Sequence, residues 1–278
     1  MSARVGRRHR RRGEGPTLAE RADRHALYQR AVQRPESDIA LFGRLFRELR
    51  GRTPRSLRED FCGTAHFATE WVRRGRGRSA VGVDLDEGPL GWGRRHNLTR
   101  LSPRRRPRVQ LAQADVREVT GPQVDLICAM NFSFCVFKTR ATLRRYFAAA
   151  RAGLVADGLL LVEIYGGTEA IVATTEERDC GRFVYRWEQE RYDPVTSETL
   201  CHIHFDFPDG SCLERAFTYD WRLWTIPEIR ETMAEAGFAA SAVYWEETDD
   251  EGDGTGFYRR TEGEENQECW MAFVVGVK

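Results

Sequence analysis

The stretch from Leu57 to Val72 constrains the fold of this chain more than any other, especially when it is considered together with Asp84. It runs Leu-Arg-Glu-Asp-Phe-Cys-Gly-Thr-Ala and continues into a helical pattern. A second predicted strand, Ala80–Val83, leads directly into Asp84. A turn that leads into a helix leaves backbone N–H groups free for a polar ligand, and a carboxylate at the tip of the next strand can accept hydrogen bonds from a ribose diol. A turn of this kind together with such a carboxylate is typical of the nucleoside-binding end of a doubly wound α/β fold.

The start of this stretch does not have the pattern of a central strand. A buried parallel strand is usually a continuous apolar run, whereas Leu57 is followed by Arg58, Glu59 and Asp60. Periodicity alone therefore does not predict a strand here.

Helical and strand patterns alternate over the rest of the first 167 residues, which predicts a mostly parallel sheet with helices on both faces. A helix after Pro35 would take Ser37 or Asp38 as its N-cap. The expected helices are Ala22–Val32, Asp38–Leu49, Glu87–Leu98 and Thr142–Leu154, and the expected strands are Ala80–Asp84, Val109–Ala114, Val124–Met130 and Gly158–Tyr165.

The alternation of helical and strand patterns ends after Gly167. Period-two alternation and good turn sequences predict an antiparallel meander inserted into the α/β pattern. Its strands are expected at Arg182–Tyr192, Thr199–Phe207 and Cys212–Tyr219, followed by a helix at Pro227–Ala236 and strands at Ala239–Trp245 and Cys269–Val277. An acidic loop with glycines separates the last two strands.

Composition excludes several classes of protein. The chain has 43 basic and 42 acidic residues, so its net charge does not indicate a nucleic-acid partner. Its seven cysteines form no C-x-x-C pair, which argues against a disulfide scaffold or a zinc site and favours a reducing cytoplasm. No apolar run predicts a membrane span, and the basic N-terminus lacks the apolar core of a secretory signal. Residues 1–16 are Arg-rich and are expected to form a disordered tail.

The chain resembles a class I S-adenosylmethionine-dependent methyltransferase. The resemblance rests on Glu59–Ala65, Gly82–Asp86, Ala114–Asp115, Ala129–Asn131 and the strand from Gly158. The first motif of the family commonly reads acidic-x-Gly-x-Gly-x-Gly; here Phe61 replaces the first glycine and Ala65 the last. The resemblance implies a doubly wound, mostly parallel seven-stranded sheet with an inserted antiparallel β meander. The tail would be followed by a single domain, 17–278, divided into N-terminal helices (17–53), a cofactor-binding half (54–167), a β substrate lid (168–224) and the last helix and strands (225–278).

The same resemblance implies S-adenosylmethionine as cofactor and assigns roles to its binding residues. Glu59 would meet the amino group of the cofactor, Asp84 the ribose hydroxyls and Asp115 the adenine amino group, while Leu85 and Met130 would enclose the adenine ring. Three acids at the tips of three consecutive strands would then meet at one edge of the sheet. The complete implied set is Tyr28, Glu59, Phe61, Cys62, Gly63, Thr64, Asp84, Leu85, Asp115, Val116 and Met130.

Methyl transfer from a sulfonium is an in-line displacement that depends on alignment more than on a protein nucleophile. We expect a small-molecule acceptor with a nitrogen or oxygen nucleophile, bound by Asn131, Phe132, Tyr165 and Trp221. The sequence identifies no catalytic base. His202 and His204 could share a metal ion, but without a third ligand they are expected to be exposed strand residues. The acidic segment Glu246–Asp253 could attract a cationic acceptor or form a solvated hairpin tip.

Other functions stay open at this stage. The Arg-rich tail would suit a methyltransferase acting on RNA or protein. A nicotinamide-dependent dehydrogenase would also use a ribose carboxylate, but it needs a G-x-G-x-x-G turn, which Phe61–His66 does not supply. A non-catalytic binding protein on the same fold is a further alternative. The sequence carries no signal for the oligomeric state.

Overall fold

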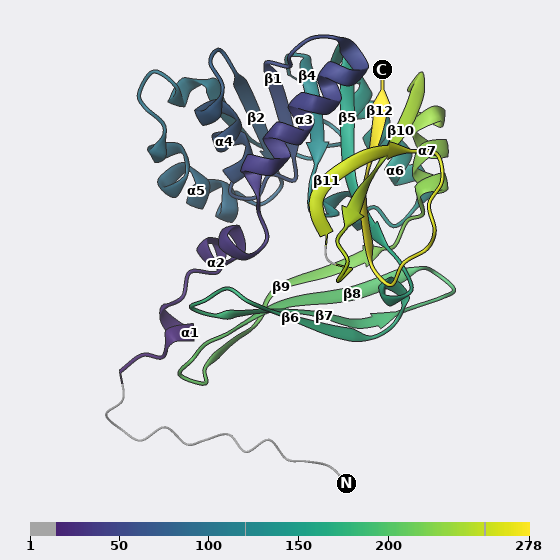
Figure 1. Ribbon diagram of the computed structural model, residues 1–278. Helices are drawn as coiled ribbons and strands as arrows, with labels where there is room; N and C mark the ends of the chain where they lie inside the picture. Colours follow the sequence, from purple (N-terminus) through teal and green to yellow (C-terminus); the bar gives the residue numbers. More distant parts are fainter. Residues whose placement is uncertain (1–14, 120, 253) are drawn as a thin grey trace.

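The computed structural model describes residues 15–119, 121–252 and 254–278. Most of the predicted disordered tail, residues 1–14, therefore lies outside the described residues, as does Asp253 at the end of the predicted acidic segment. Two β-sheets build the molecule (Figure 1). The larger sheet has helices on both faces, and the smaller sheet lies beyond one end of its strands.

The larger sheet has eight strands in the order β11-β10-β12-β5-β4-β1-β2-β3. Strands β1 to β5 are mutually parallel where they pair, and β12 runs antiparallel to both β5 and β10. The doubly wound prediction is thus confirmed, with one strand more than expected, because β11 occupies the predicted acidic loop. The strands are β1 (Ser56–Asp60), β2 (Ser79–Asp84), β3 (Val109–Gln113), β4 (Val124–Ala129), β5 (Leu154–Gly166), β10 (Ala240–Thr248), β11 (Gly254–Thr261) and β12 (Trp270–Val277).

Strand β1, which periodicity did not predict, lies at the centre of this sheet between β4 and β2. Its charged residues are buried because each finds a partner. Arg58 donates two hydrogen bonds to Asp60, at 2.8 and 3.0 Å, and the hydroxyl of Tyr146 donates to Asp60 at 3.0 Å. On the opposite face, Glu59 accepts from the backbone N–H of Ala68 at 2.8 Å. A buried charge is tolerated when it is paired and hydrogen-bonded, so these contacts replace the missing apolar run.

Helices cover the two faces of the sheet and enclose two apolar cores. Residues of α3, α4 and α5 pack in one core, and residues of α6 and α7 pack in the other. The helices are α1 (Leu18–Arg21), α2 (Arg24–Ala31), α3 (Pro35–Arg50), α4 (His66–Arg74), α5 (Glu87–His96), α6 (Arg140–Ala152) and α7 (Ile226–Glu235). Helix α3 begins at Pro35, since proline suits the first helical turn; the prediction that Ser37 or Asp38 would cap it is wrong. None of the described helices is long and apolar enough to cross a bilayer.

The smaller sheet is the predicted antiparallel insertion, in the order β6-β7-β8-β9. Its strands are β6 (Thr174–Asp179), β7 (Val184–Tyr192), β8 (Glu198–Asp206) and β9 (Cys212–Arg222). Strand β6 was not predicted, because its sequence Thr-Thr-Glu-Glu-Arg-Asp is polar throughout and it forms an edge of the sheet.

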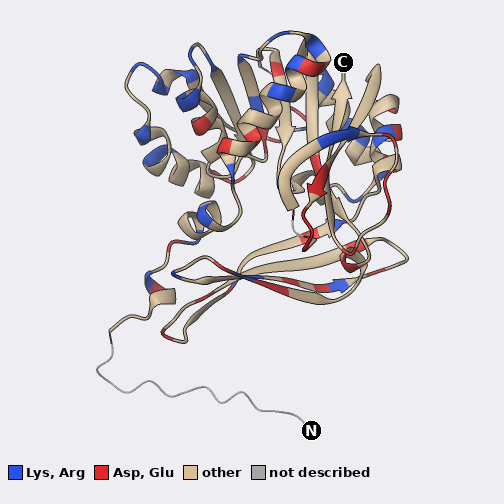
Figure 2. Cartoon of the chain, viewed as in Figure 1, with Lys and Arg blue, Asp and Glu red and all other residues tan. Residues whose placement is uncertain are grey.

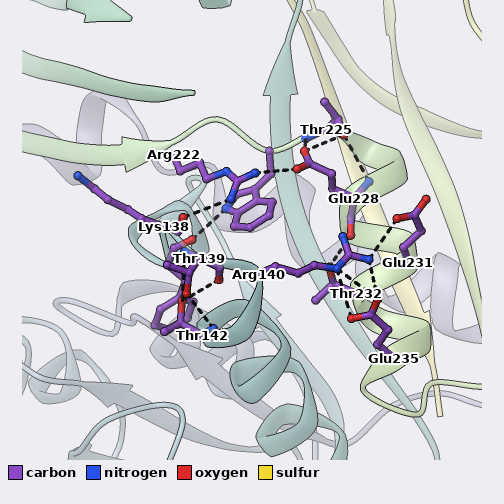
Figure 3. Close-up of polar contacts among 12 residues, drawn as sticks. Lys138, Thr139, Arg140, Thr142, Arg222, Thr225, Glu228, Glu231, Thr232 and Glu235 are labelled. Carbon is purple, nitrogen blue, oxygen red and sulfur yellow. Dashed lines mark hydrogen bonds and ion pairs between the residues drawn. The ribbon is translucent and has the colours of Figure 1, made fainter. Parts of the chain in front are cut away.

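A network of polar contacts fixes the end of the insertion to the α/β domain (Figure 3). The guanidinium of Arg222 lies 3.8 Å from the ring centroid of Trp224 and donates to Glu228 at 2.8 Å. The indole N–H of Trp224 donates to the carbonyl of Phe137 at 3.1 Å. Next to them, Arg140 at the start of α6 pairs with Glu231 and Glu235 of α7. The chain is therefore held firmly where it returns from β9 to α7.

His202 and His204 of β8 are buried, with 1% and 4% of their surface exposed, so the prediction that they are exposed is wrong. Side chains of the neighbouring strands cover them. The Nε2 atom of His202 lies 3.0 Å from Glu190, and that of His204 lies 2.9 Å from Glu188. Within the described residues, no three His, Cys, Asp or Glu side chains are arranged to hold a metal ion.

Candidate functional site

The loop between β1 and α4 has an unusual backbone. Phe61, Gly63 and Ala65 all have left-handed conformations, with φ of 57°, 52° and 51°. This conformation costs a residue with a Cβ atom about 1–2 kcal/mol, so Phe61 and Ala65 are strained where the first motif of the resembled family has glycine. The loop, residues 61–65, thus has a backbone conformation typical of glycine at three positions, although only Gly63 adopts it without strain; we call it the glycine-type loop.

Three neighbouring segments hold this loop in place. The N–H of Cys62 donates to the carbonyl of Val83 at 2.9 Å. Asn97 donates to the carbonyl of Thr64 at 2.9 Å, and Gln29 donates to the hydroxyl of Thr64 at 2.7 Å. Helix α5 comes so close that a Cβ atom at Gly93 would lie 2.2 Å from the same carbonyl oxygen. These contacts offset the strain and make the loop a preformed surface.

The three predicted acids lie at the same edge of the sheet but in different surroundings. Glu59 is 3% exposed, and burial raises its pKa to about 8. The carboxylate of Asp84 accepts from the N–H groups of Gly63 and Asp86, at 2.7 and 2.9 Å. Asp115 instead forms an ion pair with Arg117, which holds the pKa of its carboxyl below the usual value. The structure therefore joins Asp84 to the loop at Gly63 and turns Asp115 toward a cation.

A cavity of about 700 Å³ lies between this edge of the large sheet and the inserted sheet. Several predicted site residues line it together, namely Tyr28, Glu59, Met130, Asn131, Phe132, Tyr165 and Trp221. The other predicted cofactor residues do not line it: Phe61, Cys62, Gly63, Thr64, Asp84, Leu85, Asp115 and Val116. Of these, Leu85 is 66% exposed, whereas Cys62 and Val116 are buried. The cavity thus adjoins the predicted cofactor residues at Glu59 and Met130.

Sequence reasoning missed most of the carboxyl groups in this cavity. Asp38, Glu163, Glu169, Glu176 and Glu246 all line it, beside the basic residues Arg34 and Arg178. Burial raises the pKa of Asp38 to about 7 and that of Glu163 to about 8, and it also raises the pKa of Glu246. Figure 2 shows acidic segments where the large sheet faces the inserted sheet. The cavity is therefore suited to a cationic ligand.

The sequence did contain signals for these acids. Asp38 shares the apolar face of α3 with Leu41 and Phe42. Glu163 stands between Val162 and Ile164, at the end of the apolar run that starts at Leu159. A lone acid in such a run indicates either a buried pair or a functional group.

Aromatic side chains from both sheets also line the cavity. The rings of Phe132 and Tyr165 lie 4.6 Å apart between centroids. On the inserted sheet, Tyr219 and Trp221 are stacked at 4.4 Å, and Trp187 lies beside both. Aromatic rings and buried carboxyl groups in one cavity can together hold an organic cation of moderate size.

No protein-family model matches the sequence, and no curated protein matches it. Solved structures do resemble the fold. An amino pentose methyltransferase from Micromonospora echinaspora has a TM-score of 0.62 at 19% identity, covering 90% of this chain and 95% of the other. A sugar N-methyltransferase from Streptoalloteichus has a TM-score of 0.61 at 18% identity, covering 100% and 99%. An S-adenosylmethionine-dependent methyltransferase from Clostridium acetobutylicum has a TM-score of 0.63 at 17% identity, covering 90% and 96%.

Proposed function

We propose that this chain, which has the fold of the class I S-adenosylmethionine-dependent methyltransferases, transfers a methyl group from S-adenosylmethionine to an amino nitrogen of a small molecule. One observation carries the proposal. A cavity lined by carboxyl groups and aromatic rings adjoins a glycine-type loop at the carboxyl edge of the sheet. Ligands of open α/β sheets bind at this edge.

The residues of the loop fit the methyl donor. A Cβ atom at Gly63 would have no protein atom within 4 Å, so the backbone there borders open space. Asp84 is half-buried, and its carboxylate oxygens keep lone pairs for the ribose hydroxyls after accepting two backbone N–H groups. Glu59 faces the cavity and would meet the amino group of the donor. When bound, the sulfonium supplies an activated methyl; the protein aligns the acceptor and excludes water.

The charge of the cavity favours an amine over a neutral hydroxyl acceptor. Asp38, Glu59, Glu163 and Glu246 form no ion pair with any described residue, although all four line the cavity. A protonated amine would supply the missing counter-charge. The names of two structural neighbours, an amino pentose methyltransferase and a sugar N-methyltransferase, are in keeping with such an acceptor.

Ligand binding and methyl transfer test the proposal separately. In thermal-shift measurements, S-adenosylmethionine and S-adenosylhomocysteine should stabilise the protein while NAD does not, with about 2.7 kcal/mol gained at a hundredfold the dissociation constant. Transfer of a labelled methyl group should then occur to amino sugars, and the hydroxyl analogues should be poor acceptors. Stabilisation by NAD alone would contradict the cofactor assignment. Transfer to RNA, to protein or to hydroxyl sugars, with none to amines, would contradict the acceptor assignment.

A further inference from the structure

Glu163 occupies a special place in the cavity. It lies near the end of β5, between Val162 and Ile164, which are both fully buried, and its own side chain reaches the cavity. One carboxylate oxygen accepts from the backbone N–H of Asn131 at 2.5 Å. The described residues provide Glu163 with no Lys or Arg partner at ion-pair distance. The carboxylate is therefore oriented by the backbone but not neutralised.

The contact with Asn131 comes from a strained turn. Asn131 and Phe132, which follow β4 after Met130, both have left-handed conformations, with φ of 52° and 57°. Asparagine tolerates this conformation, whereas phenylalanine rarely adopts it. The turn aims the N–H of Asn131 at Glu163 and places the ring of Phe132 against Tyr165. Strain maintained at the edge of a cavity indicates that the arrangement is used.

We propose that Glu163 is the catalytic proton acceptor, which takes a proton from the ammonium group of the acceptor before methyl transfer. The assignment rests on the proposed function of the chain. It follows from the carboxylate in the cavity, its fixation by Asn131 and the aromatic neighbours that would flank an amine.

The step balances as follows. The acceptor enters as R–NH₃⁺, binds the ionised form of Glu163 and gives one proton to its carboxylate. The freed nitrogen lone pair then forms the N–C bond to the methyl carbon while the S–C bond breaks, and that bonding pair stays on sulfur. The sulfonium becomes a neutral thioether, the product leaves as R–NH₂⁺–CH₃, and Glu163 returns its proton to solvent. A carboxyl whose pKa is raised to about 8 by burial is well matched to an alkylammonium.

The other acids have different surroundings. Glu59 accepts from α4 beside the glycine-type loop. Glu246 accepts from the N–H of Gly256 at 2.8 Å and faces Tyr258 of β11. Asp38 of α3 faces Arg34 and raises the pKa of Glu163 by its charge, as Glu246 does. Only Glu163 is held by the segment that follows β4, which is the predicted acceptor side.

The test compares two probes by isothermal titration calorimetry. S-adenosylhomocysteine lacks the transferred group, and sinefungin carries a protonated amine in its place. Wild-type protein should bind sinefungin about tenfold more tightly, since the amine meets a desolvated carboxylate. Titrations in buffers of different ionisation enthalpy at pH 7 should show that sinefungin releases up to about one proton more than S-adenosylhomocysteine, because Glu163, with a pKa of about 8, must ionise to meet the amine. At pH 9 this release should vanish.

The variant Glu163→Gln preserves the shape and the acceptor for Asn131. It should bind S-adenosylhomocysteine as wild type does, but lose the preference for sinefungin and the extra proton release. Asp38 and Glu59 are present in both proteins, so the difference isolates Glu163. Glu118→Gln, an exposed acid paired with Arg145, serves as a control with wild-type behaviour. An unchanged sinefungin preference in Glu163→Gln, or equal proton release by wild type with the two probes, overturns the assignment. Wild-type protein that binds neither probe overturns the proposed function, and the assignment with it.

Discussion

The substitution Gly63→Ala separates backbone strain from ligand contact. Gly63 has a φ of 52°, and a Cβ atom there would meet no protein atom within 4 Å. The change should therefore act on stability only through the left-handed conformation. Alanine costs about 1–2 kcal/mol in this conformation, and the lower entropy of the unfolded chain returns about 0.4–1 kcal/mol. The net loss is about 1 kcal/mol, or roughly 2–4 °C in Tm for a chain of this size.

The effect on the ligand should be larger. The open space beside Gly63 is where the backbone would approach S-adenosylmethionine, so a methyl group there would overlap the ligand. Overpacking of this kind costs about 1–3 kcal/mol, which weakens binding by roughly 10- to 100-fold. Calorimetric titration with S-adenosylhomocysteine measures this loss directly.

Gly77 provides a matched control. It has a φ of 75°, also has no protein atom within 4 Å of a built Cβ, and lies in the turn before β2, at the opposite edge of the sheet. Gly77→Ala should lower the Tm by a similar amount and leave the affinity unchanged. If Gly63→Ala binds S-adenosylhomocysteine within threefold of the Gly77→Ala protein, the placement of the donor at this loop is refuted.

Three other changes test the remaining parts of the structure. Arg58→Met leaves the buried carboxylate of Asp60 without its cation and should lower the free energy of unfolding, measured in urea, by about 3–5 kcal/mol. The control Arg145→Met breaks an exposed ion pair and should lower it by less than about 1 kcal/mol. Similar losses in the two variants would contradict the account of β1. Asp84→Ala should abolish the thermal shift by S-adenosylmethionine, and an intact shift would refute the ribose assignment. The ligand-free protein should lose roughly 1 kcal/mol or more of stability between pH 6.5 and 8. Burial raises the pKa values of Asp38, Glu59 and Glu163 to about 7, 8 and 8, so the folded state holds protons in this window that the unfolded chain has already lost. Stability therefore falls as the pH rises and these protons leave the folded state. A free energy of unfolding that stays constant or rises with pH in urea titrations would contradict this.

The sequence predicted those elements whose local pattern agrees with their environment. Val124–Ala129 is apolar throughout and forms β4, which is buried throughout. Strand β1 escaped prediction because its charges are satisfied partly within the strand, by the Arg58–Asp60 pair, and partly by distant residues; Tyr146 lies 86 residues away from Asp60 in the sequence. Strand β6 escaped because an edge strand needs no apolar face. In both cases tertiary contacts or exposure outweighed the local pattern.

The residues of the candidate site also fall into those that a local sequence pattern predicted and those that it did not. A motif with fixed spacing predicted Glu59, Gly63 and Asp84, because each lies at or just after the end of a strand in a recognisable order. The sequence offered a cationic acceptor for the acidic segment from Glu246 and a local signal at Asp38, but it could not assign either residue to this cavity. The reason is that α3 and β10 lie far from the motif along the chain. Only folding brings these carboxyl groups into one cavity and raises their pKa values.

The inserted sheet is one uninterrupted piece of chain, and Arg222, Trp224 and Glu228 secure the point where it rejoins the rest. Its strands supply the cavity residues Trp187, Tyr219 and Trp221, whereas the glycine-type loop lies more than a hundred residues earlier in the sequence. Under the proposed function, mutation or recombination within this single gene segment would therefore change the choice of acceptor while the predicted methyl-donor site is inherited intact.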